Sequence, residues 1–196
     1  MIDTFSRKIT DLIKDSIDGI TPEKEEIIDY GLKIAVYESL ILIFEFSVAI
    51  FLGVFKYFLV AFTIYGLLRI VEGGAHMNSR IKCFISYCIT IFGIIFLSKH
   101  VRIGSFYCSI PLFIINFCMA YIYAPGDTLE KPILRKKDRF RLKVLSLIFI
   151  TVLFVAACII WHFDEVFFNI IILVSIFVTF LLSPIGYKLT GSKRSS

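Results

Sequence analysis

A histidine and a cysteine, His76 and Cys83, lie seven residues apart in a short polar stretch between two apolar segments. These residue types form a nucleophilic pair when the imidazole accepts the thiol proton. In one continuous helix the two side chains would share a face, but about 10.5 Å along the axis would separate them. They can therefore react together only if the chain bends between them.

Gly73 and Gly74, just before the histidine, predict that bend. Glycine is costly inside a helix and tolerates turn conformations, so we expect the preceding helix to end there and His76 to lie on a loop. We expect the two glycines to matter for the shape of the backbone more than for direct contact.

Cys83 is expected about one turn inside the next helix, because Asn78 or Ser79 can cap its start. The helix start and the neighbouring Arg80 and Lys82 favour a thiolate over a thiol. A loop histidine that folds back over this helix start could reach the sulfur. The stretch thus predicts a Cys-His pair, although either residue alone would more simply be a buried cysteine or an interfacial histidine.

The composition indicates a membrane protein. Of the 196 residues, 58% are hydrophobic and 16% aromatic, and the mean hydropathy of +0.84 exceeds that of a typical soluble domain. The net charge of +5 could suggest nucleic acid as a partner, but the basic residues flank apolar segments, as topology signals do. No nucleic-acid partner is expected.

Apolar stretches predict an all-α membrane protein with about six transmembrane helices, because one span takes about 17–25 mostly apolar residues. They lie near 34–55, 56–70, 81–98, 101–123, 142–160 and 166–183. We expect one polytopic membrane domain over 34–187 and a short cytoplasmic tail at 188–196. The second stretch is short for a crossing, so a re-entrant segment remains an alternative there.

Residues 1–33 predict two helices ahead of this domain. Apolar residues recur at steps of three and four from Ile2 to Ile20, which predicts an amphipathic helix. Its apolar face could lie in the membrane interface or pack on another helix of the same protein. Thr21 and the proline after it predict a capped second helix up to about Gly31.

A basic loop at 124–143 sets the predicted orientation. Lysines and arginines crowd the part from Lys131 to Lys143, and loops rich in these residues face the cytoplasm. Counting crossings places the loop at 69–83 and both termini on the same side. The sequence therefore predicts a multi-pass protein of the cell membrane with a cytoplasmic Cys-His loop.

The cysteine pattern predicts no metal site. The five cysteines lie in or beside apolar segments without metal-ligand spacing, and cysteine is a common buried residue. An HExxH motif or an equivalent set is absent from the sequence. We expect no metal, no other cofactor and no disulfide framework.

The polar stretch resembles a known family signature. Its residues fit the pattern R-x3-GG-x-H-x6-C of the AgrB family, the accessory gene regulator peptidases of Gram-positive quorum sensing: Arg69, Gly73, Gly74, His76 and Cys83. The block from Tyr123 to Thr128, with Lys131 and Pro132, is similar to the family's sequence after its fourth apolar segment. Gly126 departs from the alanine of many relatives, and we expect this to change turn flexibility more than chemistry.

The resemblance implies a membrane-embedded cysteine endopeptidase that acts on a small AgrD-like pro-peptide. Cys83 would be the nucleophile and His76 the general base. Cleavage would release the C-terminal part of the precursor and leave the remainder as a thioester on Cys83. A thiol or hydroxyl of the substrate would then close a thiolactone or lactone ring. Membrane lipid and a second copy of the chain, in a homodimer, are the other partners that the resemblance suggests.

Two residues near the pair have alternative interpretations. Arg69 binds a substrate carboxylate or holds the loop, or it anchors its helix at the lipid headgroups. Glu72 orients His76 as the third member of a triad, or it is a solvated loop carboxylate.

Two groups in the loop at 124–143 are candidates for supporting roles. Pro125, Asp127 and Thr128 predict a turn, which either packs near the catalytic loop or only connects two helices. The basic cluster is a topology signal and a contact for anionic lipid, and attraction of an acidic precursor tail is a compatible second role. Its candidate residues are Lys131, Arg135, Lys136 and Lys137.

Two other classes of protein remain open. A peptide exporter or permease without proteolytic activity suits six spans, but it would have no need for a Cys-His pair in a cytoplasmic loop. A non-enzymatic membrane anchor or sensor subunit would make the motifs accidental. An activated Cys83 would separate these classes, because it should react with thiol reagents well below the unperturbed thiol pKa of about 8.5.

Overall fold

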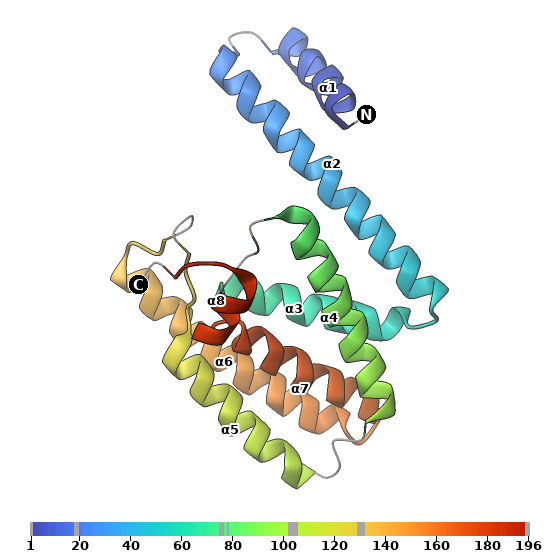
Figure 1. Ribbon diagram of the computed structural model, residues 1–196, viewed down its shortest axis with the longest axis vertical. Helices are drawn as coiled ribbons and strands as arrows, with labels where there is room; N and C mark the ends of the chain where they lie inside the picture. Colours follow the sequence, from blue (N-terminus) through green and yellow to red (C-terminus); the bar gives the residue numbers. More distant parts are fainter. Residues whose placement is uncertain are drawn as a thin grey trace. The chain divides into compact units, whose positions relative to one another are not determined.

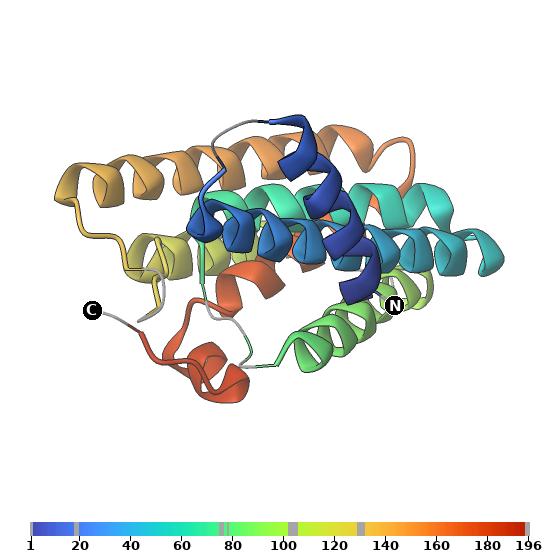
Figure 2. The same ribbon diagram turned by 90° about the horizontal axis from the view of Figure 1, so that it is seen from above.

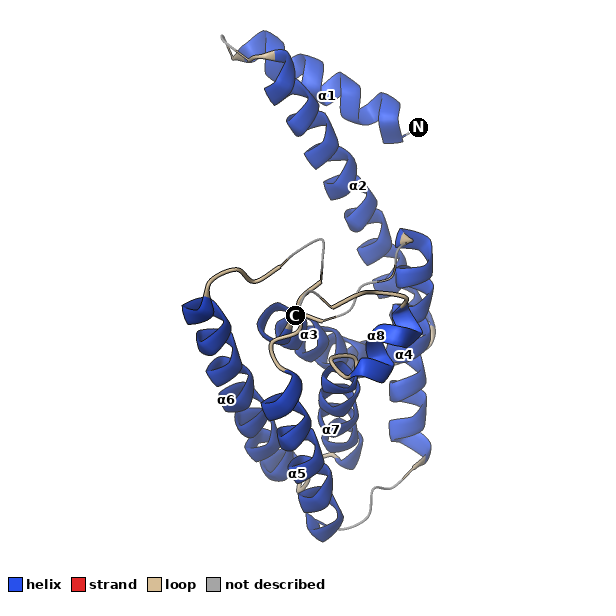
Figure 3. Cartoon of the chain, turned by 60° about the vertical axis from the view of Figure 1, so that its left-hand side comes forward, coloured by secondary structure: helices blue, strands red, loops and turns tan. Residues whose placement is uncertain are grey.

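The computed structural model describes residues 2–17, 20–74, 77, 79–101, 106–128 and 132–194. Within these ranges the chain forms helices joined by loops, without strands (Figure 3). The predicted all-α class is confirmed. The chain divides into two compact units, Met1–Gly53 and Val54–Ser196.

The N-terminal unit consists of α1 (Ile2–Ser16) and α2 (Pro22–Phe51). The Thr21 hydroxyl accepts a hydrogen bond from the backbone N–H of Lys24, so α2 begins where the sequence predicted. The predicted end near Gly31 is wrong, since α2 continues to Phe51. One glycine costs a helix only about 1 kcal/mol, and the apolar helix formers that follow outweigh it.

Polar side chains of α1 face α2. The Ser6 hydroxyl donates to the Asp29 carboxylate at 2.6 Å, and Lys14 forms an ion pair with Glu25. The apolar residues Phe5, Leu12 and Ile17 remain more than half exposed in this unit. Since Ile9 and Ile13 are half-buried, packing on α2 covers only part of the apolar face, and the rest stays available to a membrane interface.

The C-terminal unit is organised around α7. Its helices are α3 (Phe55–Glu72), α4 (Arg80–His100), α5 (Phe106–Tyr123), α6 (Lys136–Ile160), α7 (Glu165–Phe180) and α8 (Pro184–Thr190). In this unit α7 contacts α3, α4, α5 and α6 (Figure 1). Most side chains from Phe168 to Thr179 are buried, as expected for a helix that is apolar all round.

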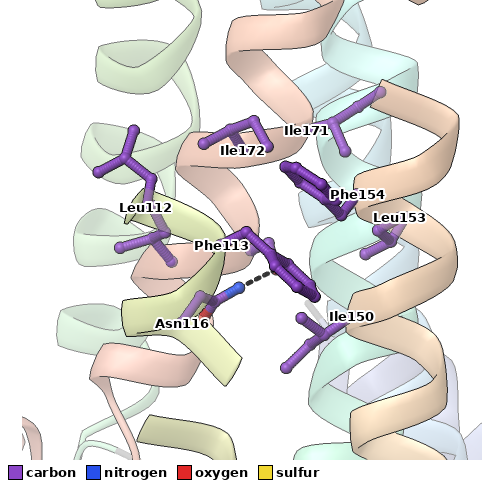
Figure 4. Close-up of a pocket in the computed structure, with 10 residues that line it drawn as sticks. Leu112, Phe113, Asn116, Ile150, Leu153, Phe154, Ile171 and Ile172 are labelled. Carbon is purple, nitrogen blue, oxygen red and sulfur yellow. Dashed lines mark hydrogen bonds between the residues drawn. The ribbon is translucent and has the colours of Figure 1, made fainter. Parts of the chain in front are cut away.

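Two amides connect α7 to its neighbours. Asn116 of α5 donates to the Ser175 hydroxyl at 2.7 Å beside a cavity of about 10 Å³ (Figure 4). Asn169 donates to the carbonyl oxygens of Ser98 and Val101, where α4 ends. Because buried polar groups require partners, these contacts fix how α4 and α5 sit on α7.

The helices differ in their capacity to cross a membrane. By length and composition, α2, α4 and α6 can each span it, and α7 with α8 could add a fourth span although they bend by 82° (Figure 2). The predicted apolar stretches fall on α2 to α7, but the six crossings stay a prediction. For α3 the sequence left a full crossing or a re-entrant segment open. Its 18 residues include Lys56, Arg69 and Glu72, and the helix is about 27 Å long.

The charged ends of α3 lie far apart. Lys56 Nζ lies 3.7 Å from Asp164 Oδ2, on the connection between α6 and α7. Arg69 lies 13 residues further along the helix, about 20 Å away. The two cations therefore lie at opposite ends of α3, and each contacts another part of the protein.

Candidate active site

The end of α3 is set by Gly73 and Gly74. Their φ angles are +69° and +108°, values that residues with a side chain rarely adopt. The backbone N–H of Gly73 donates to the Arg69 carbonyl at 3.0 Å and closes the last turn. The predicted helix break is confirmed.

The turn at 124–128 lies against this break. The N–H of Gly126 donates to the Glu72 carbonyl at 2.8 Å, and the N–H of Gly74 donates to the Gly126 carbonyl at 3.1 Å. Gly73 and Gly126 thereby form a parallel bridge between segments that are distant in the sequence. Pro125 is buried in this turn, and Thr128 is half-buried at its end.

Gly126 has a packing role that the sequence did not indicate. A Cβ atom there would lie 2.8 Å from Gly74 Cα, 2.8 Å from Tyr187 Oη and 2.9 Å from Leu182 Cδ2. These distances are shorter than the van der Waals contact distance of a carbon atom with carbon or oxygen. The expectation that glycine changes mainly the flexibility of the turn is therefore corrected: it permits the close contact of three segments.

Cys83 lies in the first turn of α4, which begins after Ser79. The Cys83 N–H donates to the Ser79 carbonyl at 2.9 Å, and the side chains of Arg80 and Lys82 are exposed. Ser79 occupies the N-cap position, so the predicted start of α4 is confirmed, but its side chain makes no capping hydrogen bond. Asn78 and His76 lie outside the described residues.

The Cys83 side chain faces a small cavity of about 40 Å³. The lining includes Arg69 and Tyr65 from α3, Thr90 from α4 and Thr190 from α8. One water needs only about 10–15 Å³ of such space, so the cavity accepts small polar groups such as a carbonyl oxygen. The fold thus brings Arg69 and Cys83 to one partly polar space.

The Arg69 side chain is hydrogen-bonded to the backbone at the glycine break, which is the end of α3 at Gly73 and Gly74. Its Nη1 donates to the Gly73 carbonyl at 2.9 Å, and the residue is half-buried. A headgroup anchor would instead extend away from the protein. Of the interpretations open from the sequence, this contact supports holding the loop.

Arg69 also lines a larger open pocket of about 470 Å³. Backbone of both bridged segments lines it, together with apolar side chains such as Ile70, Val71, Ile133 and Leu142. Arg69 also lines the Cys83 cavity, so it is common to both spaces. Asp127 and Thr128 belong to the rim of this pocket.

Glu72 is not a solvated loop residue. It is fully buried, and its carboxylate accepts a hydrogen bond from the Ser146 hydroxyl at 3.1 Å. The Thr179 hydroxyl lies 3.3 Å from Oε2. The solvated interpretation is therefore wrong: Glu72 is the last residue of α3 and connects this helix to α6 and α7. One feature of the sequence could have predicted a buried acid: the hydroxyl residues Ser146 and Thr179 each lie within an apolar stretch and need a polar partner there.

Asp127 is buried and forms contacts within the protein. Its side chain is 1% exposed and pairs with Arg139 of α6. Its carbonyl oxygen accepts a hydrogen bond from Tyr187 Oη at 2.7 Å. Sequence reasoning missed Tyr187 and treated Arg139 only as a topology cation, because no local pattern relates either residue to position 127.

The basic cluster begins a helix. Arg135 is the N-cap of α6, and Lys136 and Lys137 occupy its first turn with exposed side chains, while Lys131 lies outside the described residues. The predicted loop at 124–143 is therefore helical from Lys136 onward, because lysine and arginine are good helix formers. Cations at a helix N-terminus are electrostatically unfavourable. The basic cluster therefore does not stabilise α6.

Comparison with known proteins identifies the family of the chain. The family model described as "Accessory gene regulator B" matches residues 6–182. Accessory gene regulator protein B of Staphylococcus aureus is 33% identical over 144 residues, which cover 74% of this chain and 76% of the relative. A protein of Clostridium perfringens named AgrB-like is 27% identical over 78% of this chain and 73% of its own length.

A protein of Clostridium acetobutylicum, also named AgrB-like, is 29% identical over 76% of this chain and 69% of its own length. No solved structure matches the chain. Since the family model covers nearly all of the chain, including both bridged segments and α4, the chain belongs to the accessory gene regulator B family.

Proposed function

We propose that this protein is a cysteine endopeptidase of the cell membrane. It would cleave a small AgrD-like precursor and promote the closure of a thiolactone or lactone ring, which yields an autoinducing peptide for quorum sensing. The observation that carries the proposal is that Cys83, in the first turn of α4, shares a cavity with Arg69. Arg69 in turn holds the glycine break that leads to His76.

In the first step, the His76 imidazole takes the proton of the Cys83 thiol, and the sulfur attacks a peptide carbonyl of the precursor. The carbon–nitrogen bond then breaks, and the departing amine takes the proton from the imidazolium. The N-terminal part of the precursor remains as a thioester on Cys83, and the C-terminal part leaves.

In the second step, a thiol or hydroxyl of the bound peptide attacks the thioester carbonyl. The ring closes, the carbon–sulfur bond to Cys83 breaks, and the proton of the attacking group passes by way of His76 to the Cys83 sulfur, which restores the thiol. Exchange of one thioester for another is nearly balanced in energy, so the step depends chiefly on keeping water from the acyl-enzyme. The small Cys83 cavity, between helices of a membrane protein, suits this requirement.

The two spaces beside Arg69 suggest how the precursor lies. The pocket of about 470 Å³ is large enough for peptide side chains and is largely apolar. Arg69, which is common to both spaces, would bind a carbonyl or carboxylate of the peptide. The exposed Arg135, Lys136 and Lys137 would contact anionic lipid and attract an acidic precursor tail on the cytoplasmic face.

Reconstituted protein tests the proposal. A candidate precursor is a short reading frame beside this gene with an amphipathic N-terminus, a central cysteine or serine and an acidic C-terminus. Wild-type protein in liposomes should convert it to two fragments, whereas Cys83→Ala and His76→Ala should yield none. Intact-mass spectrometry identifies the products, and Cys118→Ala, on the exposed side of α5, is the matched control.

Cleavage by the Cys83→Ala protein would refute the proposal. Membrane insertion of each variant is measured in the same preparations, so that loss of protein is not mistaken for loss of activity. If wild-type protein moves the precursor into the vesicles uncleaved, the exporter interpretation is correct instead.

A further inference from the structure

The C-terminal segment closes over the turn at 124–128 with three side chains, which we call the C-terminal clamp: Leu182, Tyr187 and Arg194. Tyr187 donates to the Asp127 carbonyl, and Arg194 Nη2 donates to the Tyr123 carbonyl at 3.1 Å. Leu182 is fully buried, and its Cδ2 lies 2.9 Å from the Cβ position of both Gly74 and Gly126. The clamp thus touches both segments of the glycine bridge.

Tyr187 is the central member of the clamp. Its side chain is 5% exposed, and its hydroxyl reaches Asp127 across 60 residues of sequence. A buried carbonyl oxygen that loses its donor retains the cost of desolvation without compensation. The Tyr187 hydroxyl therefore helps to fix the peptide between Asp127 and Thr128, which directly follows Gly126 and its two peptides.

The two peptides that flank Gly126, immediately before it, are hydrogen-bonded to the end of α3. Gly126 accepts from the Gly74 N–H and donates to the Glu72 carbonyl, and the neighbouring Gly73 carbonyl is the acceptor for Arg69. A displacement at residues 126–127 would consequently move the bridge, the Arg69 guanidinium and the chain that leads to His76.

We propose that Tyr187 is a positioning residue for the Cys83 site, acting through the glycine bridge on Arg69. The inference rests on the proposed function. Tyr187 is absent from the described residues that line the Cys83 cavity, so it acts through the backbone and not on the reacting atoms. Thr190, one turn further along the chain, does line that cavity, which shows that α8 reaches the site.

The test compares Tyr187→Phe with Tyr121→Phe in liposomes. Phenylalanine keeps the ring and removes only the hydroxyl, and Tyr121 is a matched control because it lies exposed on α5. Tyr187→Phe should lower kcat for precursor cleavage by about tenfold per folded molecule, since small displacements of catalytic groups are costly. KM should rise as well, because Arg69 and the displaced turn also line the larger pocket.

Hydrogen exchange provides the second measurement. Peptides that contain Gly74 and Gly126 should exchange faster in Tyr187→Phe, while peptides from the centre of α7 should be unchanged. If Tyr187→Phe does not fold, Leu182→Val loosens the same clamp more gently and should show the same pattern with a smaller loss of kcat.

Either of two results would overturn the inference. Exchange at the bridge could be unchanged, or it could rise while kcat stays within about twofold of wild type, which would indicate a merely structural hydroxyl. In both cases the wild-type protein still cleaves the precursor, so the proposed function survives. A wild-type protein that cleaves no precursor overturns both proposals.

Discussion

The Arg69 guanidinium donates a hydrogen bond of 2.9 Å to the carbonyl oxygen of Gly73, four residues further along the chain. This contact holds the end of α3 in the positive-φ backbone that Gly73 and Gly74 adopt. It also places a permanent positive charge between the Cys83 cavity and the larger pocket. One side chain therefore shapes the break in the helix and faces the space where the precursor would bind.

Arg69→Lys should lower kcat/KM for precursor cleavage by about tenfold or more. Lysine keeps the charge but loses the planar fork that can bond to Gly73 and a substrate oxygen at once. Kinetics in liposomes measure the effect, with Arg7→Lys on exposed α1 as the control. Wild-type kinetics in Arg69→Lys would contradict a role of the guanidinium fork in binding the precursor.

Gly126→Ala should destabilise the C-terminal unit by roughly 1–3 kcal/mol, because the added methyl group would meet backbone and two side chains. Thermal unfolding in detergent measures this change. Gly93→Ala is the matched control, since its methyl group would meet nothing within 4 Å, and alanine should favour α4 by up to about 1 kcal/mol. Equal unfolding temperatures for Gly126→Ala and wild type would contradict the close packing.

Glu72→Ala should cost roughly 2–4 kcal/mol in the free energy of unfolding, because the buried Ser146 and Thr179 hydroxyls lose their shared acceptor. Glu72→Gln keeps an acceptor oxygen and should cost less, and Ser146→Ala should cost about 1 kcal/mol. Denaturation and cleavage are measured on the same samples. A Glu72→Gln protein that unfolds like wild type but has lost cleavage would instead support the triad role.

Reversal of Arg135, Lys136 and Lys137 to glutamate should weaken precursor processing several-fold while the topology is unchanged. Acidic residues suit a helix N-terminus better than cations, so the start of α6 should remain folded. Cleavage assays at low and high salt measure the effect, because screening should reduce the wild-type advantage. If reporter fusions show inverted topology, the cluster acts through orientation alone.

Local sequence chemistry determined much of this protein. The glycine pair predicted where α3 ends, Ser79 predicted where α4 begins, and together they place Cys83 in a first helical turn. These features depend on backbone conformations and caps that neighbouring residues decide. The apolar stretches likewise predicted the all-α membrane class, because their length and composition are set by the bilayer.

Only the tertiary structure decided which distant residues meet. The bridge from Gly73 to Gly126, the burial of Glu72 under Ser146 and the reach of Tyr187 to Asp127 join segments separated by 53 to 74 residues. Such contacts arise from the packing of α7 against its neighbours and the 82° bend before α8. No periodicity or motif encodes them, since a residue's partner across the bundle depends on how whole helices pack.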